Sequence, residues 1–379
     1  MSSDKTVTIV GAGPGGLTAA ISLAKNGYDV NLYEQNNDVG LRFNGDFQGL
    51  ENWADEEDTL VILKRIGINT NFLCYPYNGN DGHFVGPKLQ KISVKTSRPL
   101  FYLIERGSNT NSLDQGLRKQ AEDLGVNFLW GQKLDSLHNQ SAIVGTGPKA
   151  ADAIAKGIVF ETSHKNIFIG FVNNKIAPKA YAYLLVNNGK ATFATCMFED
   201  FKNENIYYTR SLSVLNSVID INIIKPKEFG GFVNYFNEPI ISKNDKILYV
   251  GENAGFQDAL WGFGIKYAML SGYYAAQSII HELNYFELCK KQLFPKLQTS
   301  LANRWLFVHL FNTGYNIILN KIGRIEDVIP ALRKHYNTSL SKRLVYKMAK
   351  RWYKTRLIDK KCMHVHCDCV WCRHGKLAH

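Results

Sequence analysis

The chain has 379 residues, of which 45% are hydrophobic and 21% charged, and its formal net charge is +12. This composition excludes a disordered chain and predicts a globular protein long enough for two domains. The positive charge is concentrated near the end, because residues 333–379 contain thirteen Lys or Arg and two Asp. Such a segment binds anionic lipid, nucleic acid or an acidic partner, or it forms a solvated helical face.

The first residues predict a βαβ unit that binds a dinucleotide. Residues 6–10 (TVTIV) are typical of a buried strand, residues 14–26 of a helix, and residues 28–34 (YDVNLYE) of a second strand. A G-x-G-x-x-G motif joins the first strand to the helix, and an acid ends the second strand, where it can bind ribose hydroxyls. We therefore predict a pyrophosphate at the helix N-terminus and a cofactor site that includes Gly11, Gly13, Pro14, Gly15, Gly16, Glu34 and Gln35.

Beyond this unit the sequence alternates between helical and β-like segments. Residues 112–124 predict a helix that begins with a capping-box pattern. Residues 158–240 contain many short β-like runs and predict a mostly antiparallel sheet. Residues 246–251 (KILYVG) predict another buried strand, and the chain after the following turn predicts helices as far as residue 356.

Residues 247–272, ILYVGENAGFQDALWGFGIKYAMLSG, resemble the G-D-A-A-G-F-x-D-P-x-x-x-G-I segment of an FAD-binding superfamily. That superfamily holds geranylgeranyl reductases, flavin-dependent halogenases and aromatic hydroxylases. Glu252 stands where the family has Asp, and Ala259 where it has Pro. The resemblance implies that the acid contacts FAD and that the next helix points its positive N-terminus at the flavin ring. The residues it implies for the FAD site are Gly251, Glu252, Gly262, Gly264 and Ile265.

Two arginines fit the same family. The segment around residues 103–131 resembles its R-x-x-F-D-x-x-L helix, which implies that Arg106 lies near the flavin, with Leu113-Asp114 close to the Phe-Asp pair. VGLRFNG puts Arg42 where the family often has a cofactor-facing Arg, and the alternative for Arg42 is a surface salt bridge.

A second match to G-x-G-x-x-G/A occurs in residues 143–155, IVGTGPKAADAIA. A second βαβ unit would need a full helix and an acid about twenty residues on, and Glu161 comes too early. We interpret this stretch, with Gly147, as the segment that in the resembled family closes the ADP side of the same FAD.

The resemblance covers residues 5–285 and implies an α/β fold. The predicted architecture is a Rossmann-like FAD-binding domain with an inserted, mostly antiparallel β substrate domain and a helical C-terminal region. The predicted bounds are 1–70, 95–165 and 240–285 for the FAD-binding domain, 71–94 and 166–239 for the substrate domain, 286–360 for the helical region and 361–379 for a Cys/His-rich tail.

Aromatic residues suggest where a substrate binds. YAYLLV (181–186) stands where reductases of the family carry Y-x-W-x-F-P, which implies that Tyr181 and Tyr183 face substrate; the alternative is an ordinary aromatic strand face. Trp261 is a further predicted substrate residue. The halogenase motif W-x-W-x-I-P is absent, and Lys64 is a candidate for the halogenase lysine without further support. We expect reduction of C=C bonds in an apolar or prenylated substrate by flavin hydride, with NAD(P)H or another reductant as electron donor and no catalytic side chain assigned.

Four of the seven cysteines crowd into the tail CMHVHCDCVWCRH (362–374). Four thiolates this close can bind an iron–sulfur cluster or zinc. The alternatives are a thiol/disulfide pair or thiols without a role. The predicted metal ligands are Cys362, Cys367, Cys369 and Cys372.

Two other functions stay open: a flavin-dependent monooxygenase that consumes NAD(P)H and oxygen, and a nucleic-acid-binding or regulatory flavoprotein that uses the basic tail. We expect an apolar small molecule or lipid as substrate and an electron-donor protein as partner, and we do not favour nucleic acid. The apolar stretch 305–319 is too short and too polar to span a bilayer. We therefore expect a cytoplasmic protein whose basic C-terminal region makes peripheral contact with the inner face of the membrane.

Overall fold

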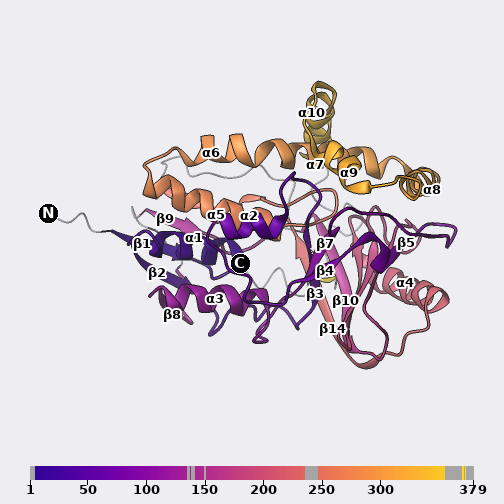
Figure 1. The fold of residues 1–379 in the computed structure, drawn as a ribbon, viewed down its shortest axis with the longest axis horizontal. Coiled ribbons are helices and arrows are strands. Elements are labelled where there is room, and N and C mark those ends of the chain that lie inside the picture. Colours follow the sequence, from indigo (N-terminus) through magenta and orange to yellow (C-terminus); the bar gives the residue numbers. More distant parts are fainter. Residues whose placement is uncertain are drawn as a thin grey trace.

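The computed structural model describes residues 5–134, 137, 141–148, 151–234, 246–354, 369–370 and 372. Three β-sheets lie side by side, and a layer of C-terminal helices covers them along one side (Figure 1). This mixed α/β arrangement, with one parallel sheet, one mostly antiparallel sheet and helices at the end, confirms the predicted fold class.

A five-stranded parallel sheet in the order β15-β9-β1-β2-β8 contains the start of the chain. Its strands are β1 (Thr6–Val10), β2 (Asp29–Glu34), β8 (Asn127–Trp130), β9 (Ala142–Val144) and β15 (Ile247–Tyr249). Helix α1 (Pro14–Ala24) packs against α3 (Leu113–Asp123) and α5 (Ile265–Ile280). The β1-α1-β2 unit confirms the predicted βαβ opening, and Ile9, Val30 and Leu32 of its strands pack in one buried cluster with residues of the helices.

Glycines allow α1 to lie directly against its neighbours. A Cβ at Gly16 would lie 2.0 Å from the carbonyl oxygen of Gly11, and a Cβ at Gly272 of α5 would lie 2.0 Å from that of Gly15. Only glycine fits these two positions, so the first turn of α1 is held close to both β1 and α5.

The N-terminus of α3 is capped as predicted, but the box is not closed. The Ser112 hydroxyl accepts a hydrogen bond from the Gln115 N–H at 3.2 Å. The Gln115 side chain donates instead to Asp38, at 2.8 Å. It thereby ties α3 to the loop after β2 rather than to its own N-terminus.

A seven-stranded sheet in the order β14-β10-β13-β12-β11-β5-β6 forms the second unit, and only the β11–β5 pair is parallel. The strands are β5 (Gly82–Val85), β6 (Lys91–Ile92), β10 (Ala153–Glu161), β11 (Ile167–Phe171), β12 (Ala182–Asn187), β13 (Lys190–Met197) and β14 (Ile224–Val233). β10 therefore pairs in this sheet, although the sequence division placed residues 95–165 with the FAD-binding domain. A small antiparallel sheet, β3-β7-β4, joins the two units through β3 (Phe47–Glu51), β4 (Tyr75–Tyr77) and β7 (Phe101–Glu105).

Helix α4 (Glu204–Val218) lies within residues 158–240, where the sequence predicted a mostly antiparallel sheet and no helix was named. Its buried Tyr208 and Leu215 pack in the same cluster as Phe193 of the large sheet. Because residues seven positions apart lie on the same side of a helix, both side chains can contact the sheet only when this segment is helical.

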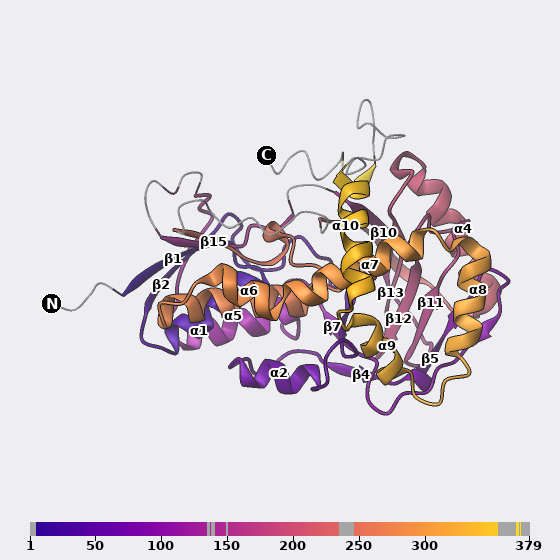
Figure 2. The same cartoon turned by 90° about the horizontal axis from the view of Figure 1, so that it is seen from above.

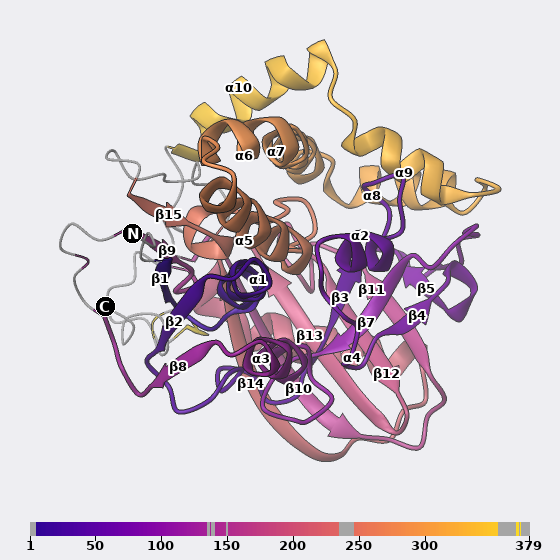
Figure 3. The same cartoon turned by 60° about the vertical axis from the view of Figure 1, so that its left-hand side comes forward.

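The remaining helices are α2 (Thr59–Arg65), α6 (Tyr285–Gln292), α7 (Phe294–Val308), α8 (Phe311–Ile322), α9 (Val328–Tyr336) and α10 (Leu340–Lys354), with short 3₁₀ turns η1 (Gly79–Asp81), η2 (Phe201–Asn203) and η3 (Gly251–Ala254). Helices α6 and α7 run from the parallel sheet towards the large sheet (Figure 2). Helix α10 packs on α7 and is the outermost element of this layer (Figure 3). Within the described residues, no helix combines the length and the apolar character needed to cross a membrane.

Candidate functional site

The glycine turn after β1 leaves room for a phosphate group. Gly11 has a φ of +99°, and a Cβ there would lie 2.5 Å from the carbonyl oxygen of Gly145. Gly13 precedes α1 as its N-cap and has no side chain to cover the free N–H groups of the first turn. A Cβ at Gly13 would meet only the oxygen of Gly145, at 3.8 Å, so the space beside this helix N-terminus is open.

Glu34 is fixed at the end of β2, beside this turn. One carboxylate oxygen accepts a hydrogen bond from the Ala12 N–H at 2.9 Å, and the other accepts from the backbone and the side chain of Asn36 at 3.0 and 2.8 Å. These contacts hold the carboxylate at the rim of the cavity described below, where sequence analysis expected a ribose.

The second glycine motif lies on the same side of the same sheet. Strand β9 pairs with β1 and ends at Val144, and Gly145, Thr146 and Gly147 then line the same cavity as the first glycine turn. The chain enters strand β10 at Ala153, so the eight residues after β9 leave no room for the long helix of a second βαβ unit. The geometry agrees with one nucleotide site formed by two strand ends.

A single cavity of about 1160 Å³ joins this turn to the C-terminal helices. Every residue predicted to bind the cofactor or the substrate lines this cavity except Gly16, which packs against β1 instead. The predicted residues that line it are Gly11, Gly13, Pro14, Gly15, Glu34, Gln35, Arg42, Arg106, Gly147, Tyr181, Tyr183, Gly251, Glu252, Trp261, Gly262, Gly264 and Ile265.

Arg106 is held by a buried carboxylate. Two of its guanidinium nitrogens donate to the two oxygens of Asp114, both at 2.9 Å, and the Gly107 N–H donates to the same carboxylate at 2.9 Å. The guanidinium carbon also lies 4.0 Å from the centre of the Phe43 ring. Burial alone would lower the pKa of Arg106, but Asp114 raises it, so the arginine is a fixed positive charge in the cavity wall.

Arg42 and Glu252 form a second charged group in the cavity. Arg42 is exposed to the cavity space. Its guanidinium group donates a hydrogen bond to the carbonyl of Phe232 at 2.8 Å, and its guanidinium carbon lies 4.4 Å from the centre of the Phe232 ring. Glu252 accepts a hydrogen bond from the Asn234 N–H at 3.0 Å. Burial raises the pKa of Glu252 to about 7, although Arg42 opposes this rise. The Glu252 carboxyl therefore titrates near neutral pH beside a permanent cation.

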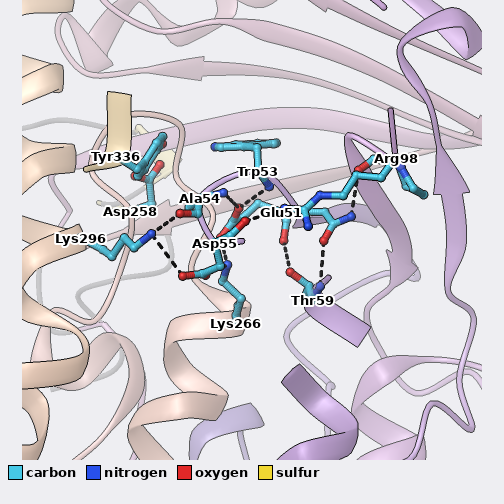
Figure 4. A network of polar contacts seen from close by, with 12 residues as sticks. Glu51, Trp53, Ala54, Asp55, Thr59, Arg98, Asp258, Lys266, Lys296 and Tyr336 are labelled. Carbon is cyan, nitrogen blue, oxygen red and sulfur yellow. Dashed lines mark hydrogen bonds and ion pairs between the residues drawn. The ribbon is translucent and has the colours of Figure 1, made fainter. Parts of the chain in front are cut away.

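A buried ion-pair network lies at the N-terminus of α5 (Figure 4). Lys266, only 1% exposed, pairs with Glu51 and, at 2.7 Å, with Asp55. Lys296 of α7 pairs with Asp55 at 3.2 Å and donates to the carbonyl of Ala54. Burial acts to raise the pKa of Asp55, but the two ammonium groups lower it to about 2. The network fixes the start of α5 to the loop after β3, while the residues just before Lys266 line the cavity.

The turn before α5 is held by Asp258, which was part of the resembled motif but was not assigned a role. Its carboxylate accepts hydrogen bonds from the Trp261 N–H at 2.7 Å and from the Tyr336 hydroxyl at 3.0 Å. Burial raises the pKa of Asp258 to about 6. Tyr181 donates its hydroxyl to the Trp261 carbonyl, so both faces of this turn are fixed.

The side chains around the predicted substrate residues are neutral. Burial raises the pKa of Tyr181 and of Tyr183 well above the ordinary value of tyrosine, and it raises the pKa of the Cys196 thiol to about 12. All three residues line the cavity and keep their protons at neutral pH. This part of the wall suits an uncharged ligand.

Beyond these residues the cavity wall is mostly apolar, with Asn303, Lys321 and His335 as polar members from the helices. Strands of the large and small sheets form one wall, and helices α7, α8 and α9 form the other. Leu306 and Ile318, at 44% and 38% exposed, also line the cavity and place its mouth between α7 and α8. The side chains of this apolar arm are Phe84, Phe101, Phe168, Leu185, Leu260, Phe307, Leu310, Tyr315, Leu319, Ile322, Val328 and Leu332.

Two sequence predictions find no support in this site. Cys369 is 2% exposed and packs in an apolar cluster with Phe232 and Val370, whereas Cys362 and Cys367 lie outside the described residues. Among the residues that are described, no three His, Cys, Asp or Glu side chains are grouped to hold a metal ion. Lys64 is exposed in the last turn of α2 and is not part of the cavity wall.

Comparisons with known proteins agree with the geometry of the glycine turn. A family model for an NAD(P)-binding Rossmann-like domain matches residues 9–46. The flavin-containing monooxygenase FMO GS-OX-like 8 of Arabidopsis thaliana is 43% identical over 70 residues, which cover 18% of this chain and only 14% of that protein. An uncharacterized protein of Methanocaldococcus jannaschii is 26% identical over 328 residues, which cover 76% of this chain and 74% of the relative.

Solved structures share the whole fold. A flavin-dependent brominase, Bmp2, matches with a TM-score of 0.64 and 13% identity over 92% of this chain and 99% of its own. The chain therefore shares its fold with this flavin-dependent enzyme. A geranylgeranyl bacteriochlorophyll reductase-like protein from Thermoplasma acidophilum matches with a TM-score of 0.67 and 17% identity over 93% of this chain and 99% of its own.

Proposed function

We propose that the chain binds FAD in the glycine-lined part of the cavity and reduces C=C bonds of an apolar, prenylated substrate held in the apolar arm. The observation that carries the proposal is the continuity of the cavity. A polar end with a helix N-terminus and two arginines leads directly into an arm of aliphatic and aromatic side chains.

The residues at the polar end fit FAD. The open space beside Gly13 and the free N–H groups of α1 suit a pyrophosphate, and Glu34 suits a ribose. Arg42 supplies a positive charge exposed to the same space. Gly262, Gly264 and the first residue of α5 would lie against the flavin ring, where the helix dipole stabilises negative charge.

FAD, when bound and reduced, would supply a hydride to one carbon of an alkene, and a proton donor or water would supply the proton to the other carbon. The chain's own contribution is to hold an apolar substrate in a fixed position and to exclude water from it. Tyr181 and Trp261 both line the cavity, with ring centres 5.8 Å apart, and the Tyr181 hydroxyl donates a hydrogen bond to the Trp261 carbonyl. These two side chains would therefore position the reacting end of the substrate. NAD(P)H or a donor protein would supply the electrons.

The cofactor part of the proposal is tested by the absorbance spectrum and flavin content of the purified protein. We expect one FAD per chain, because the two glycine motifs face one cavity. Tight, stoichiometric binding of NADPH at a separate saturable site, or a protein that neither carries nor takes up FAD, would overturn it.

The reaction is tested without oxygen. The protein is reduced with dithionite under anaerobic conditions and mixed with a prenylated lipid in detergent, with the fully saturated lipid as control. We expect flavin reoxidation only with the unsaturated lipid, and a product that gains two hydrogen atoms. A product that instead gains one oxygen atom, and forms only when oxygen and NAD(P)H are supplied, would identify a monooxygenase.

A further inference from the structure

Helix α10 presents a face that the rest of the described chain does not cover. On one side, Ala349 and Tyr353 are buried against α7. On the opposite side, Leu340, Leu344 and Met348 are 80%, 64% and 55% exposed. Residues four positions apart lie above one another on a helix, so these three side chains form one continuous apolar stripe.

Basic residues accompany the stripe along its whole length. Helix α10 contains six Lys or Arg and no Asp or Glu. Each residue of the stripe is followed three positions later by an exposed basic residue: Arg343 after Leu340, Lys347 after Leu344 and Arg351 after Met348. The α10 outer face is defined here by these three apolar and three basic residues.

We propose that the α10 outer face docks on the surface of an anionic phospholipid bilayer, with the helix parallel to the membrane plane. The apolar stripe would enter the boundary between head groups and acyl chains, and the three basic side chains would reach the lipid phosphates. Only such a surface contacts both the apolar stripe and the three basic residues of the α10 outer face.

The composition of the face argues against two other occupants. A stable dimer buries on the order of 800 Å² per partner, far more than three side chains on one helix provide. Nucleic acid would be bound by the basic residues but would leave the apolar stripe in water. Lipid with a negative head group satisfies both, because it offers charge and an apolar layer within one helix diameter.

The location of the face adds a functional reason. Helix α10 packs on α7, and α7 carries Leu306 at the mouth of the cavity. The contact is close, since the ring centres of His309 at the end of α7 and Trp352 of α10 lie 5.7 Å apart. If the proposed function holds, a docked molecule would have its cavity mouth near the layer that contains its substrate.

The test uses flotation of the full chain with vesicles of phosphatidylcholine alone or mixed with phosphatidylglycerol. We expect binding to the anionic vesicles that weakens with salt. The triple variant Leu340→Ser/Leu344→Ser/Met348→Ser should lose it. Replacing the three basic residues by glutamine (R343Q/K347Q/R351Q) should lower the affinity on the order of a hundredfold, since each contributes about a factor of five.

Helix α4 and the turn before it provide a matched control, because Lys202, Ile206 and Arg210 are also exposed and spaced by four residues. The variant Lys202→Gln/Ile206→Ser/Arg210→Gln should bind vesicles like the unmodified chain. All variants must keep their circular dichroism spectrum and flavin absorbance.

Three results would overturn the proposal: equal binding to neutral and anionic vesicles, retained binding by the stripe variant, or a dimer in solution that the stripe variant converts to a monomer without any vesicle binding. Activity on a detergent-dispersed lipid is measured separately. If the unmodified chain does not bind anionic vesicles but is active on the detergent-dispersed lipid, the docking face alone is rejected. If it binds the vesicles but is inactive on that lipid, the proposed function alone is rejected.

Discussion

The buried pair of Arg106 and Asp114 gives the sharpest prediction about stability. Replacing Asp114 with Ala leaves a guanidinium that is 8% exposed without its two hydrogen bonds at 2.9 Å, and it leaves the Gly107 N–H without its acceptor. Removing one partner of a buried ion pair costs about 3–5 kcal/mol. Since a domain is stable by only about 5–15 kcal/mol, the variant should unfold at a much lower urea concentration.

The measurement is urea unfolding at pH 7 of the flavin-free protein, followed by circular dichroism. Asp114→Asn should cost less than Asp114→Ala, because the amide keeps one hydrogen-bond acceptor. The double variant Arg106→Met/Asp114→Leu should be more stable than Asp114→Ala, because it removes both charges together. If Asp114→Ala unfolds within about 0.5 kcal/mol of the unmodified chain, the pair is not desolvated as described and the reasoning is refuted.

Three other changes are expected to act at the cavity. Because burial raises the pKa of Glu252 from 4.5 to about 7, the folded flavin-free chain should lose stability as the pH rises through this range. The loss should be at most about 3 kcal/mol, since the carboxyl group partly faces the cavity. In urea titrations between pH 5 and pH 8, the Glu252→Gln variant should lose less stability than the unmodified chain. Gly13→Val fills the open space beside α1, so the purified variant should carry little FAD while its circular dichroism spectrum is unchanged; full FAD occupancy would contradict this. Ile318→Trp narrows the cavity mouth and should raise KM for a long apolar substrate about tenfold, whereas Ile317→Trp, on a residue that is 64% exposed and outside the cavity wall, should not.

Local sequence patterns were sufficient to predict the strands and the helix at the start of the chain. The strand before Gly11, the helix after Gly13 and the strand that ends at Glu34 each have a period, a turn or a cap that lies within a few residues. The resemblance then pointed to Arg42 and Glu252, which the fold brings to one cavity from segments 210 positions apart. For these parts, the short-range pattern predicted the elements, and the family motif pointed to residues that line one cavity.

The parts that were missed depend on long-range contacts. The pairing of Lys266 with Glu51 and Asp55 joins segments more than 200 residues apart, and a single lysine in the first turn of a helix gives no pattern that predicts a partner. Helix α4 was missed because Ile206, Tyr207 and Val214 favour strands by propensity, and only packing against the large sheet makes the segment helical. Strand β10 belongs to the large sheet because it pairs with β13 and β14, and its own residues do not reveal these partners.

The second glycine motif shows where local spacing stops being informative. Gly145 and Gly147 satisfy the spacing that a phosphate-binding turn requires, and both lie at the cavity. The spacing does not reveal how many nucleotide sites the motifs form. Because β9 lies beside β1, the carbonyl of Gly145 occupies the place that a Cβ of Gly11 would take. The two motifs thus form one turn region, in which Gly11 must be glycine because the backbone of the second motif lies against it.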